Sequence, residues 1–302
     1  MSVKDDYTAD DLVNLAPQHK SLVCIDSDGC TFDTMDVKQK TCFHTLIVSH
    51  WGLESIEKYV REAAEFVNLY SRWRGQNRFL GLITMFDFLR ERKEIIESGI
   101  EMPQLPALRR FIASGVPLGN PTLEKAVSET GDPELTFLLN WSKEVNRWVA
   151  EKVTNVPPFK WVRESLDKVK ANSDAICTSQ TPVEALVREW HEHDIAQYVS
   201  VIAGQELGTK GEHISLASKG KYEPEDILMI GDALGDKRAA RENNALFYPV
   251  NPAHEEESWE RFCKEAYDRF LNHEYAGEYE EARITEFEAL LPEIPPWKQN
   301  GI

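Results

Sequence analysis

Cysteine is scarce in this 302-residue chain, and the five cysteines, at positions 24, 30, 42, 177 and 263, include no Cys-x-x-Cys pair. A sparse, odd set of this kind excludes a disulfide-rich scaffold and is typical of a reduced, intracellular protein. No apolar run approaches the roughly 20 residues that cross a bilayer. The N-terminal segment 1–18 carries four Asp and no apolar run, which is unlike a signal peptide. We therefore expect a soluble, cytoplasmic protein that does not contact membranes.

Basic residues are also few, since 34 Lys and Arg stand against 51 Asp and Glu and give a formal net charge of −17. Nucleic-acid binding needs a basic footprint, so this balance argues against it. The global charge does not exclude a small phosphorylated ligand, because the local charge of a site can oppose the global sign. The hydrophobic content of 42% is ample for one large domain or two.

The first feature that carries chemistry is the stretch at residues 22–34, whose apolar run ends in an Asp-Ser-Asp-Gly sequence. Successive side chains of a strand point to opposite faces, so Asp26 and Asp28 start on the same side. Carboxylates this close repel each other unless a cation intervenes, and a divalent ion with oxygen ligands is suited to that role. An EF-hand loop needs Gly at its sixth position and Glu at its twelfth, where this chain has Thr31 and Val37. A site at the end of a buried strand is the better interpretation.

Short apolar segments alternate with helical patterns in the second half of the chain. We expect strands at 22–27, 174–178, 198–203, 227–231 and 245–248, with helices at 182–193, 210–217 and 234–243. Strands that alternate with helices at this spacing predict an α/β fold with a doubly wound, Rossmann-like parallel sheet. The first strand is separated from the others by about 130 residues with helical periodicity alone. This long segment is therefore predicted to be a helical insertion.

Four segments follow from this pattern. Residues 1–36 hold the first strand and the loop after it, 37–165 form the helical insertion, and 166–252 complete the sheet. The remaining segment, 253–302, is predicted to be a helical extension packed on the core. It is strongly acidic, with 13 Asp and Glu against five Lys and Arg over residues 254–302.

Three later features stand near the ends of the predicted core strands. The strand at 174–178 ends in Thr178, which Ser179 follows, and Lys210 opens a predicted helix. The strand at 227–231 runs into Gly-Asp, with Asp232 followed four residues later by Asp236. Parallel strands bring their carboxyl ends to one edge of the sheet, where ligands bind in open α/β folds. We expect these side chains to gather with Asp26 at that edge.

Together, these motifs resemble those of the haloacid dehalogenase-like superfamily, whose members are mostly phosphatases. The resemblance implies that Asp26 attacks phosphorus and that Asp28 acts as the general acid and base. It also implies that Thr178, supported by Ser179 and its backbone amide, binds the phosphoryl group. Lys210 would neutralise the nucleophile and the phosphate.

The same resemblance implies a Mg²⁺ cofactor and a helical cap. The metal would be held by Asp26, by Asp28 through its backbone carbonyl, and by Asp232 and Asp236. Gly29 lets the chain turn after the acids and is assigned to substrate binding. The insertion after the first motif would be the cap, although it is about twice the size of the commoner small helical caps. The implied activity is hydrolysis of a small phosphorylated metabolite through a phosphoaspartyl intermediate.

Other functions stay open from the sequence. A sugar-phosphate mutase of the same family keeps both Asp26 and Asp28 and is the nearest alternative. A dehalogenase lacks an acid at the second position, because a halide needs no protonation. Phosphonate hydrolysis needs a cap lysine, and nothing singles out Lys38, Lys40 or Lys58. A catalytically silent binding or scaffold protein is the alternative from a different class.

Substrate specificity is expected to come from the insertion. The candidates there are Arg72, Arg74 and Arg78, which lie in an aromatic and basic stretch at residues 70–78. Arginine forks suit a second anionic group on a substrate. An exposed helix end with solvated arginines explains the same pattern more simply. The sequence names neither the substrate nor the oligomeric state.

Overall fold

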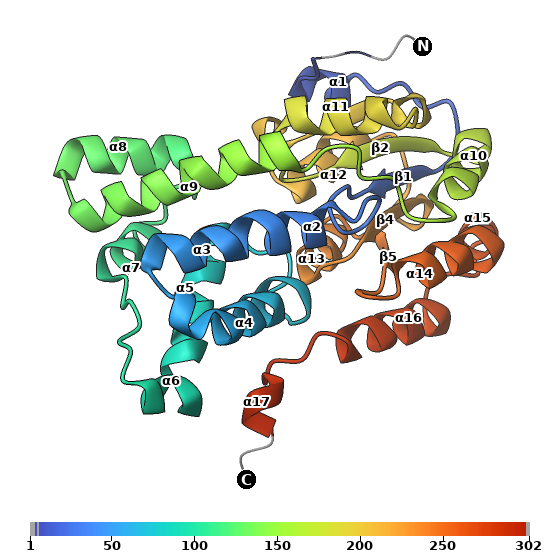
Figure 1. Cartoon of the computed structure of the whole chain (residues 1–302). Coiled ribbons are helices and arrows are strands. Elements are labelled where there is room, and N and C mark those ends of the chain that lie inside the picture. The colour runs from blue at the N-terminus through green and yellow to red at the C-terminus, as the bar shows by residue number, and fades with distance from the viewer. Residues whose placement is uncertain (1–3, 5, 300–302) are drawn as a thin grey trace. The chain divides into compact units, whose positions relative to one another are not determined.

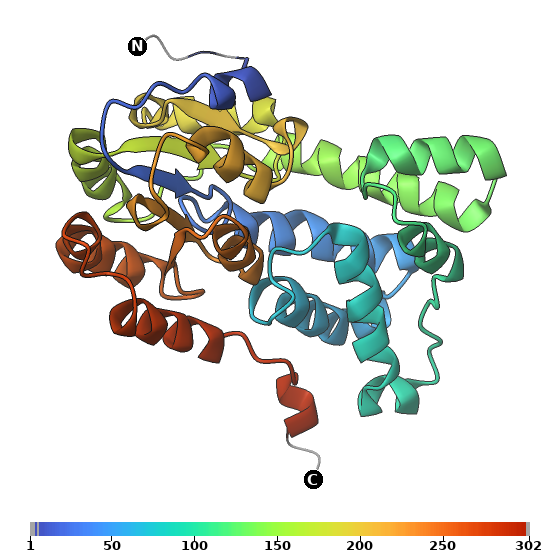
Figure 2. The same ribbon diagram turned by 180° about the vertical axis from the view of Figure 1, so that it is seen from behind.

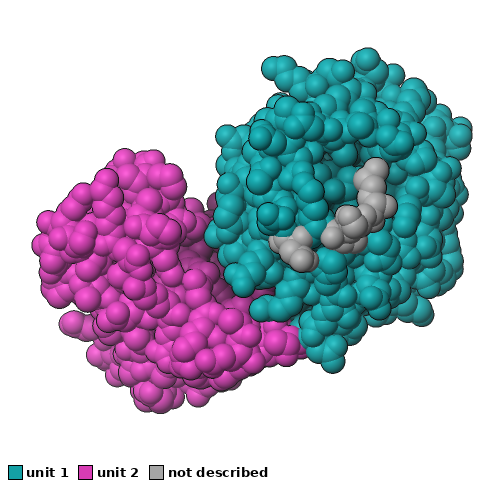
Figure 3. Space-filling view, turned by 90° about the horizontal axis from the view of Figure 1, so that it is seen from above, with its two compact units in different colours: residues 1–35, 155–291 teal, residues 36–154, 292–302 magenta. Residues whose placement is uncertain are grey.

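The computed structural model describes residues 4 and 6–299 of the chain, which forms two compact units (Figure 3). Unit 1 takes its described residues from 1–35 and 155–291, and unit 2 takes its described residues from 36–154 and 292–302. Each unit has its own cluster of buried hydrophobic side chains. Most of the helical insertion thus lies in a compact unit with its own hydrophobic core. None of the described helices is long and apolar enough to cross a membrane.

Unit 1 is built on a five-stranded sheet of the strand order β3-β2-β1-β4-β5, and all paired strands are parallel. The strands are β1 (Leu22–Ile25), β2 (Asp174–Thr178), β3 (Val201–Ala203), β4 (Ile227–Gly231) and β5 (Leu246–Pro249). Nearly all their residues are buried, as expected for a sheet covered on both faces. This topology confirms the predicted α/β class. The strands β1 to β3 follow one another in one direction along the sheet, and β4 and β5 follow in the other direction. The boundary between β1 and β4 is thus the switch point of the topology, and ligands bind at such points in open α/β folds.

Helices cover both faces of the sheet (Figures 1 and 2). One face carries α1 (Ala9–Val13), α12 (Lys210–Ser218) and α13 (Leu234–Glu242). The other face carries α10 (Val162–Asn172) and α11 (Val183–Glu192), and α16 (Glu278–Ala289) contacts β5. Between β5 and α16 the chain forms α14 (Glu255–Arg261), a π-helix η6 (Phe262–Ala266) and α15 (Tyr267–Leu271). The register pairs Ile25 with both Cys177 and Ile230, so β1, β2 and β4 end at the same level.

Unit 2 is helical throughout. The chain enters it through α2 (Thr34–Val37), and the unit comprises η1 (Lys38–Phe43), α3 (His44–Trp51), η2 (Glu54–Ile56), α4 (Glu57–Leu69), α5 (Arg78–Arg90), α6 (Lys93–Ser98), α7 (Pro106–Ala113), α8 (Asn120–Thr130), α9 (Pro133–Lys152) and α17 (Pro296–Gln299). The helix η1 is a π-helix, which the periodicity of the sequence did not predict. Such wider turns are rare and occur frequently at functional sites.

The observed division differs from the predicted segments by one residue after β1, since Asp36 belongs to unit 2, and by more at two other places. Residues 155–165 belong to unit 1, because Phe159 donates its backbone N–H to the Thr31 carbonyl and Pro158 forms a bridge with Phe32. Residues 292–299 belong to unit 2, where the Trp297 ring lies 5.6 Å from Phe66, centroid to centroid. The predicted C-terminal extension is therefore shared between the two units.

Candidate active site

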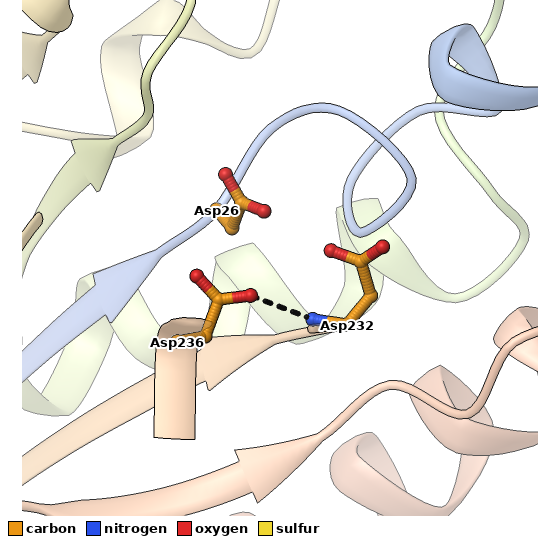
Figure 4. A group of neighbouring side chains, drawn as sticks. All are labelled: Asp26, Asp232 and Asp236. Atoms are coloured by element: carbon orange, nitrogen blue, oxygen red, sulfur yellow. Dashed lines mark hydrogen bonds between the residues drawn. The ribbon is translucent and has the colours of Figure 1, made fainter. Parts of the chain in front are cut away.

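Three carboxylates meet at the carboxyl edge of the sheet (Figure 4). Asp26 follows β1, Asp232 follows β4, and Asp236 lies in the first turn of α13. One oxygen from each lies within 4.8 Å of the others, and all three residues are buried. The Asp26 backbone N–H donates to the Ile230 carbonyl at 3.0 Å, which extends the pairing of the two strands up to the site. The expected meeting of these acids is thus present in the fold.

The Gly-Asp sequence after β4 has a steric reason. A Cβ atom on Gly231 would lie 2.3 Å from the Asp236 Cβ, so only glycine admits that side chain so close to the strand. The Asp236 carboxylate in turn accepts the backbone N–H groups of Asp232 at 3.1 Å and Ala233 at 3.0 Å. An acid at this position satisfies unpaired donors of the helix N-terminus. Asp236 therefore fixes the turn that carries Asp232.

Lys210 bridges two of the three acids. Its Nζ lies 2.9 Å from an Asp26 oxygen and 2.5 Å from an Asp236 oxygen. Burial raises the pKa of Asp26 well above its ordinary value, and the charges of Asp236 and Asp232 raise it further, while Lys210 opposes the shift. Burial alone would lower the pKa of Lys210, but Asp236 and Asp26 reverse that effect and raise it. The lysine is thus held as a cation beside the carboxylate expected to attack.

The donor set fits a hard divalent cation. Three carboxylates and one lysine leave an excess of negative charge in a buried place, and like charges disfavour full ionisation there. Oxygen ligands converging on one point are what Mg²⁺ prefers. Lys210 contacts one oxygen each of Asp26 and Asp236, and the second oxygens accept backbone N–H groups, from Ser27 on Asp26 and from Asp232 and Ala233 on Asp236. Asp26, Asp232 and Asp236 are the residues that could hold the ion.

The side chain of Asp28 accepts hydrogen bonds from residues outside the group of three acids. Its carboxylate accepts a hydrogen bond from the Thr181 hydroxyl at 2.7 Å and another from the Thr34 hydroxyl. The Asp28 carboxylate is not one of the three gathered acids, so the expectation that this residue ligates through its backbone carbonyl stays a prediction. Asp26 and Asp28 begin two residues apart yet have separate surroundings.

Thr178 lies at the end of β2, where the sequence placed it, but its hydroxyl has a partner that the sequence did not indicate. The Thr178 Oγ1 lies 2.9 Å from Nδ1 of His213, a fully buried residue of α12 one turn after Lys210. Burial, with the nearby Lys210 charge, lowers the pKa of His213 to about 4, so the ring is neutral at neutral pH. Ser179 differs from its expected role, because its backbone N–H donates to the Ala203 carbonyl at 2.9 Å. The Ser179 amide is therefore used by the sheet.

The loop after β1 is stabilised by hydrogen bonds within the loop and by hydrogen bonds from residues that are distant in the sequence. The Ser27 carbonyl accepts backbone N–H groups from Cys30, Thr31 and Phe32, and Gly29 adopts a φ of 76° that allows this tight turn. Two buried tryptophans hold the same loop through their indole N–H groups. Trp190 of α11 donates to the Ser27 hydroxyl at 3.0 Å, and Trp259 of α14 donates to the Cys30 carbonyl at 2.7 Å. Neither tryptophan has a sequence motif that marks this contact.

The three arginines proposed for specificity have different environments in unit 2. Arg72 is half-exposed and pairs with Glu293 at 2.8 Å, which is the solvated surface arrangement that the sequence favoured. Arg74 is buried and donates to the Leu69 carbonyl at 2.8 Å. Arg78 donates to uncharged acceptors, the Ser142 and Asn146 oxygens. The three residues thus do not form one cluster with a shared role.

No protein-family model and no curated protein matches this chain. Among solved structures, it is similar to a predicted phosphoglycolate phosphatase from Haemophilus somnus 129pt, with 14% identity, a TM-score of 0.46, and coverage of 76% of this chain and 84% of that one. It is also similar to a candidate β-phosphoglucomutase from Thermotoga maritima, with 16% identity, a TM-score of 0.39, and coverage of 84% and 97%. A third is a magnesium-bound haloacid dehalogenase-type hydrolase from Bacillus subtilis, with 9% identity, a TM-score of 0.45, and coverage of 76% and 86%. These are remote similarities, and the function is argued below from the residues of this chain.

Proposed function

We propose that this protein is a Mg²⁺-dependent phosphate-monoester hydrolase that works through a phosphorylated Asp26. The observation that supports the proposal best is the pairing of Asp26 with Lys210 inside a group of three buried carboxylates. A carboxylate must approach a negatively charged phosphoryl group in order to attack it, and an adjacent cation reduces the repulsion. A fixed buried cation beside one acid is what this reaction needs.

In the first step an Asp26 oxygen forms a bond to phosphorus, and the bond from phosphorus to the alcohol oxygen breaks. Asp28 supplies the proton that the departing oxygen takes up. Asp28 must exchange its contacts with Thr181 and Thr34 for the leaving group when it does so. Lys210 stays beside Asp26 and neutralises charge on the phosphoryl oxygens.

In the second step Asp28, now ionised, removes a proton from a water molecule, which attacks phosphorus. The bond between Asp26 and phosphorus breaks, inorganic phosphate leaves, and both carboxylates return to their starting states. Thr178 stands at the end of the neighbouring strand and would donate its hydroxyl to the phosphoryl group, with His213 fixing its orientation. A bound Mg²⁺ would supply charge neutralisation to the phosphoryl oxygens.

The test uses p-nitrophenyl phosphate, whose aryl leaving group departs as a stable anion. The wild-type protein should release phosphate with Mg²⁺ and stop with EDTA. Asp26→Asn should remove the activity and any covalent phosphoprotein. Asp28→Asn should still form the phosphoprotein from this substrate but hydrolyse it slowly, because its general base is absent. Turnover by Asp26→Asn at the wild-type rate would refute the proposal.

The same assay separates hydrolysis from the mutase alternative. A mutase would interconvert sugar phosphates faster than it releases inorganic phosphate. A hydrolase would release phosphate in proportion to substrate consumed. If no phosphate ester is hydrolysed, although cooperative unfolding shows that the protein is folded, a binding or scaffold role is favoured instead.

A further inference from the structure

The loop after β1 is anchored on both sides of Asp28. Before it, the Ser27 hydroxyl accepts a hydrogen bond from Nε1 of Trp190 at 3.0 Å. After it, the Cys30 carbonyl accepts a hydrogen bond from Nε1 of Trp259 at 2.7 Å. Both indoles are fully buried, and they come from α11, which follows β2, and from α14, which follows β5 (Figure 1). All these residues belong to unit 1, so two distant segments of one unit hold the backbone around a single carboxylate.

The Trp190 anchor acts on the residue that orients the expected nucleophile. Ser27 donates its backbone N–H to Oδ1 of Asp26 at 2.8 Å, while Lys210 lies 2.9 Å from the other oxygen of the same carboxylate. The Ser27 carbonyl accepts three backbone N–H groups of the loop, and its hydroxyl accepts the Trp190 N–H. The Trp190 ring also packs edge to face with Phe32, with the ring centroids 6.1 Å apart. A displacement of Ser27 would therefore change the direction of the Asp26 carboxylate.

The Trp259 anchor holds the turn that follows Asp28. Gly29 adopts a φ of 76° in this turn and donates its backbone N–H to the Phe32 carbonyl at 2.8 Å. The next carbonyl, of Cys30, is held by the indole. In the proposed reaction the Asp28 side chain exchanges its two threonine partners for the leaving group. An anchored backbone confines this exchange to rotation about the side-chain torsions, which is a smaller change than movement of the whole loop.

Burial of an indole does not by itself produce such a contact in this protein. Buried indole N–H groups usually find an acceptor, but Trp141 of α9 is 1% exposed and its Nε1 has no hydrogen-bond partner among the described residues. Trp190 and Trp259 differ from it because their N–H groups bind the loop that carries the two acids. A tryptophan has only two side-chain torsions, so a packed indole directs its N–H at a small entropic cost.

We propose that Trp190 and Trp259 are positioning residues, whose indole N–H groups fix the loop so that its two acids point in the directions that attack and proton transfer need. The inference rests on the proposed hydrolase function for the reaction, and on the two hydrogen bonds for the positions. Residues that orient metal-binding groups typically contribute about 10- to 100-fold to metal affinity or activity. Helix α14, which lies in the predicted C-terminal extension, thereby takes part in the reaction through Trp259.

The kinetic test removes each indole N–H and keeps an aromatic ring. Trp190→Phe and Trp259→Phe should each lower kcat for p-nitrophenyl phosphate about 10- to 100-fold at an unchanged KM. Trp141→Phe makes the same change at a buried indole without a described partner, and should keep the wild-type kcat. Ser27→Ala removes the acceptor of Trp190 and tests the same bond should Trp190→Phe not fold. The double variant should lose no more than either single variant, and additive losses or a wild-type kcat would overturn the role of Trp190.

A comparison of leaving groups separates the position of Asp28 from general packing. Phenyl phosphate has a more basic leaving group than p-nitrophenyl phosphate and depends more on a proton from the general acid. Rapid-quench measurement of phosphoprotein formation should therefore show a larger loss for phenyl phosphate in Trp259→Phe. Trp259→His, which retains a ring N–H, should show a smaller difference between the two esters. Equal losses for both esters, as expected from poorer packing alone, would overturn the role of Trp259.

Magnesium binding tests the loop without turnover. Asp26 is one of the three residues that could hold the ion, so a displaced carboxylate should bind it more weakly. Titration calorimetry should give an affinity about tenfold lower for Trp190→Phe and for Ser27→Ala, and a wild-type affinity for Trp141→Phe. An unchanged affinity in both loop variants would overturn the positioning of Asp26. If no phosphate ester is hydrolysed but Mg²⁺ binding depends on Trp190, the proposed function fails and the positioning role stands.

Discussion

Removing the charge of Lys210 tests whether the three acids and the lysine form one electrostatic unit. Lys210→Met keeps most of the aliphatic length but leaves Asp26, Asp232 and Asp236 without their cation. Breaking a buried ion pair by removal of one partner costs about 3–5 kcal/mol, because the remaining charge stays desolvated. For a protein of this size each kcal/mol corresponds to roughly 2–4 °C. We therefore expect the unfolding midpoint of unit 1 to fall by about 6–20 °C at neutral pH.

The pH dependence of this variant has a definite sign. Burial already raises the pKa of Asp26, and Lys210 is the group that opposes the rise. Without the lysine the folded-state pKa moves further above the unfolded value, so the folded state binds protons more tightly. Lys210→Met should regain stability as the pH falls toward the ordinary pKa of an aspartate, and lose it again as the pH rises. Mg²⁺ should also stabilise the variant more than the wild type, since the ion replaces the missing charge.

Thermal denaturation followed by circular dichroism measures these effects. Lys237→Met is the matched control, because Lys237 pairs with Glu288 at the surface, where an ion pair contributes about 0–1 kcal/mol. Replacing Asp236 with Asn in the Lys210→Met background removes one of the repelling charges and should recover part of the loss. A decrease below about 1 kcal/mol for Lys210→Met, equal to that of the control, would refute the reasoning.

Two further predictions concern a buried histidine and the glycine behind the acids. Burial lowers the pKa of His44 from 6.5 to about 3. On acidification the His44 ring is therefore protonated in the unfolded state at a pH where it is still neutral in the folded state. Linkage predicts a loss of about 2 kcal/mol between pH 7.5 and 5, which urea unfolding should show in the wild type and to a lesser extent in His44→Gln. An equal loss in both proteins would contradict this. Gly231→Ala places a Cβ 2.3 Å from the Asp236 Cβ, so the turn must move. We expect a loss of about 1–3 kcal/mol in stability and roughly 100-fold in phosphate release, and activity within twofold of wild type would exclude this steric role.

The sequence alone determined the sheet and the acids at its edge, because both depend on local patterns. The apolar runs of β1 and β4 each end directly in the acid-bearing turn, so the parallel order of the strands was enough to bring Asp26 and Asp232 together. Lys210 was predictable for the same reason, since it opens the helix after β3. The position of a residue close to the end of a strand is set when that strand pairs with its neighbours.

Tertiary structure alone decided the partners that these residues take. Thr181 reaches Asp28, and Trp259 reaches Cys30, across 153 and 229 residues of sequence, and no local periodicity reports such a contact. The same holds for α17, which belongs to unit 2 although it lies in the segment that was predicted to pack on the core.

Two arginines of the insertion, Arg72 and Arg78, show the distinction most directly. In the sequence Arg72 and Arg78 differ little, since both lie in one aromatic and basic stretch at residues 70–78. In the fold Arg72 pairs with Glu293, while Arg78 donates to neutral oxygens and lies against an aromatic ring. The charge of a side chain is set by its residue type, but whether that charge is neutralised depends on residues brought near it by folding.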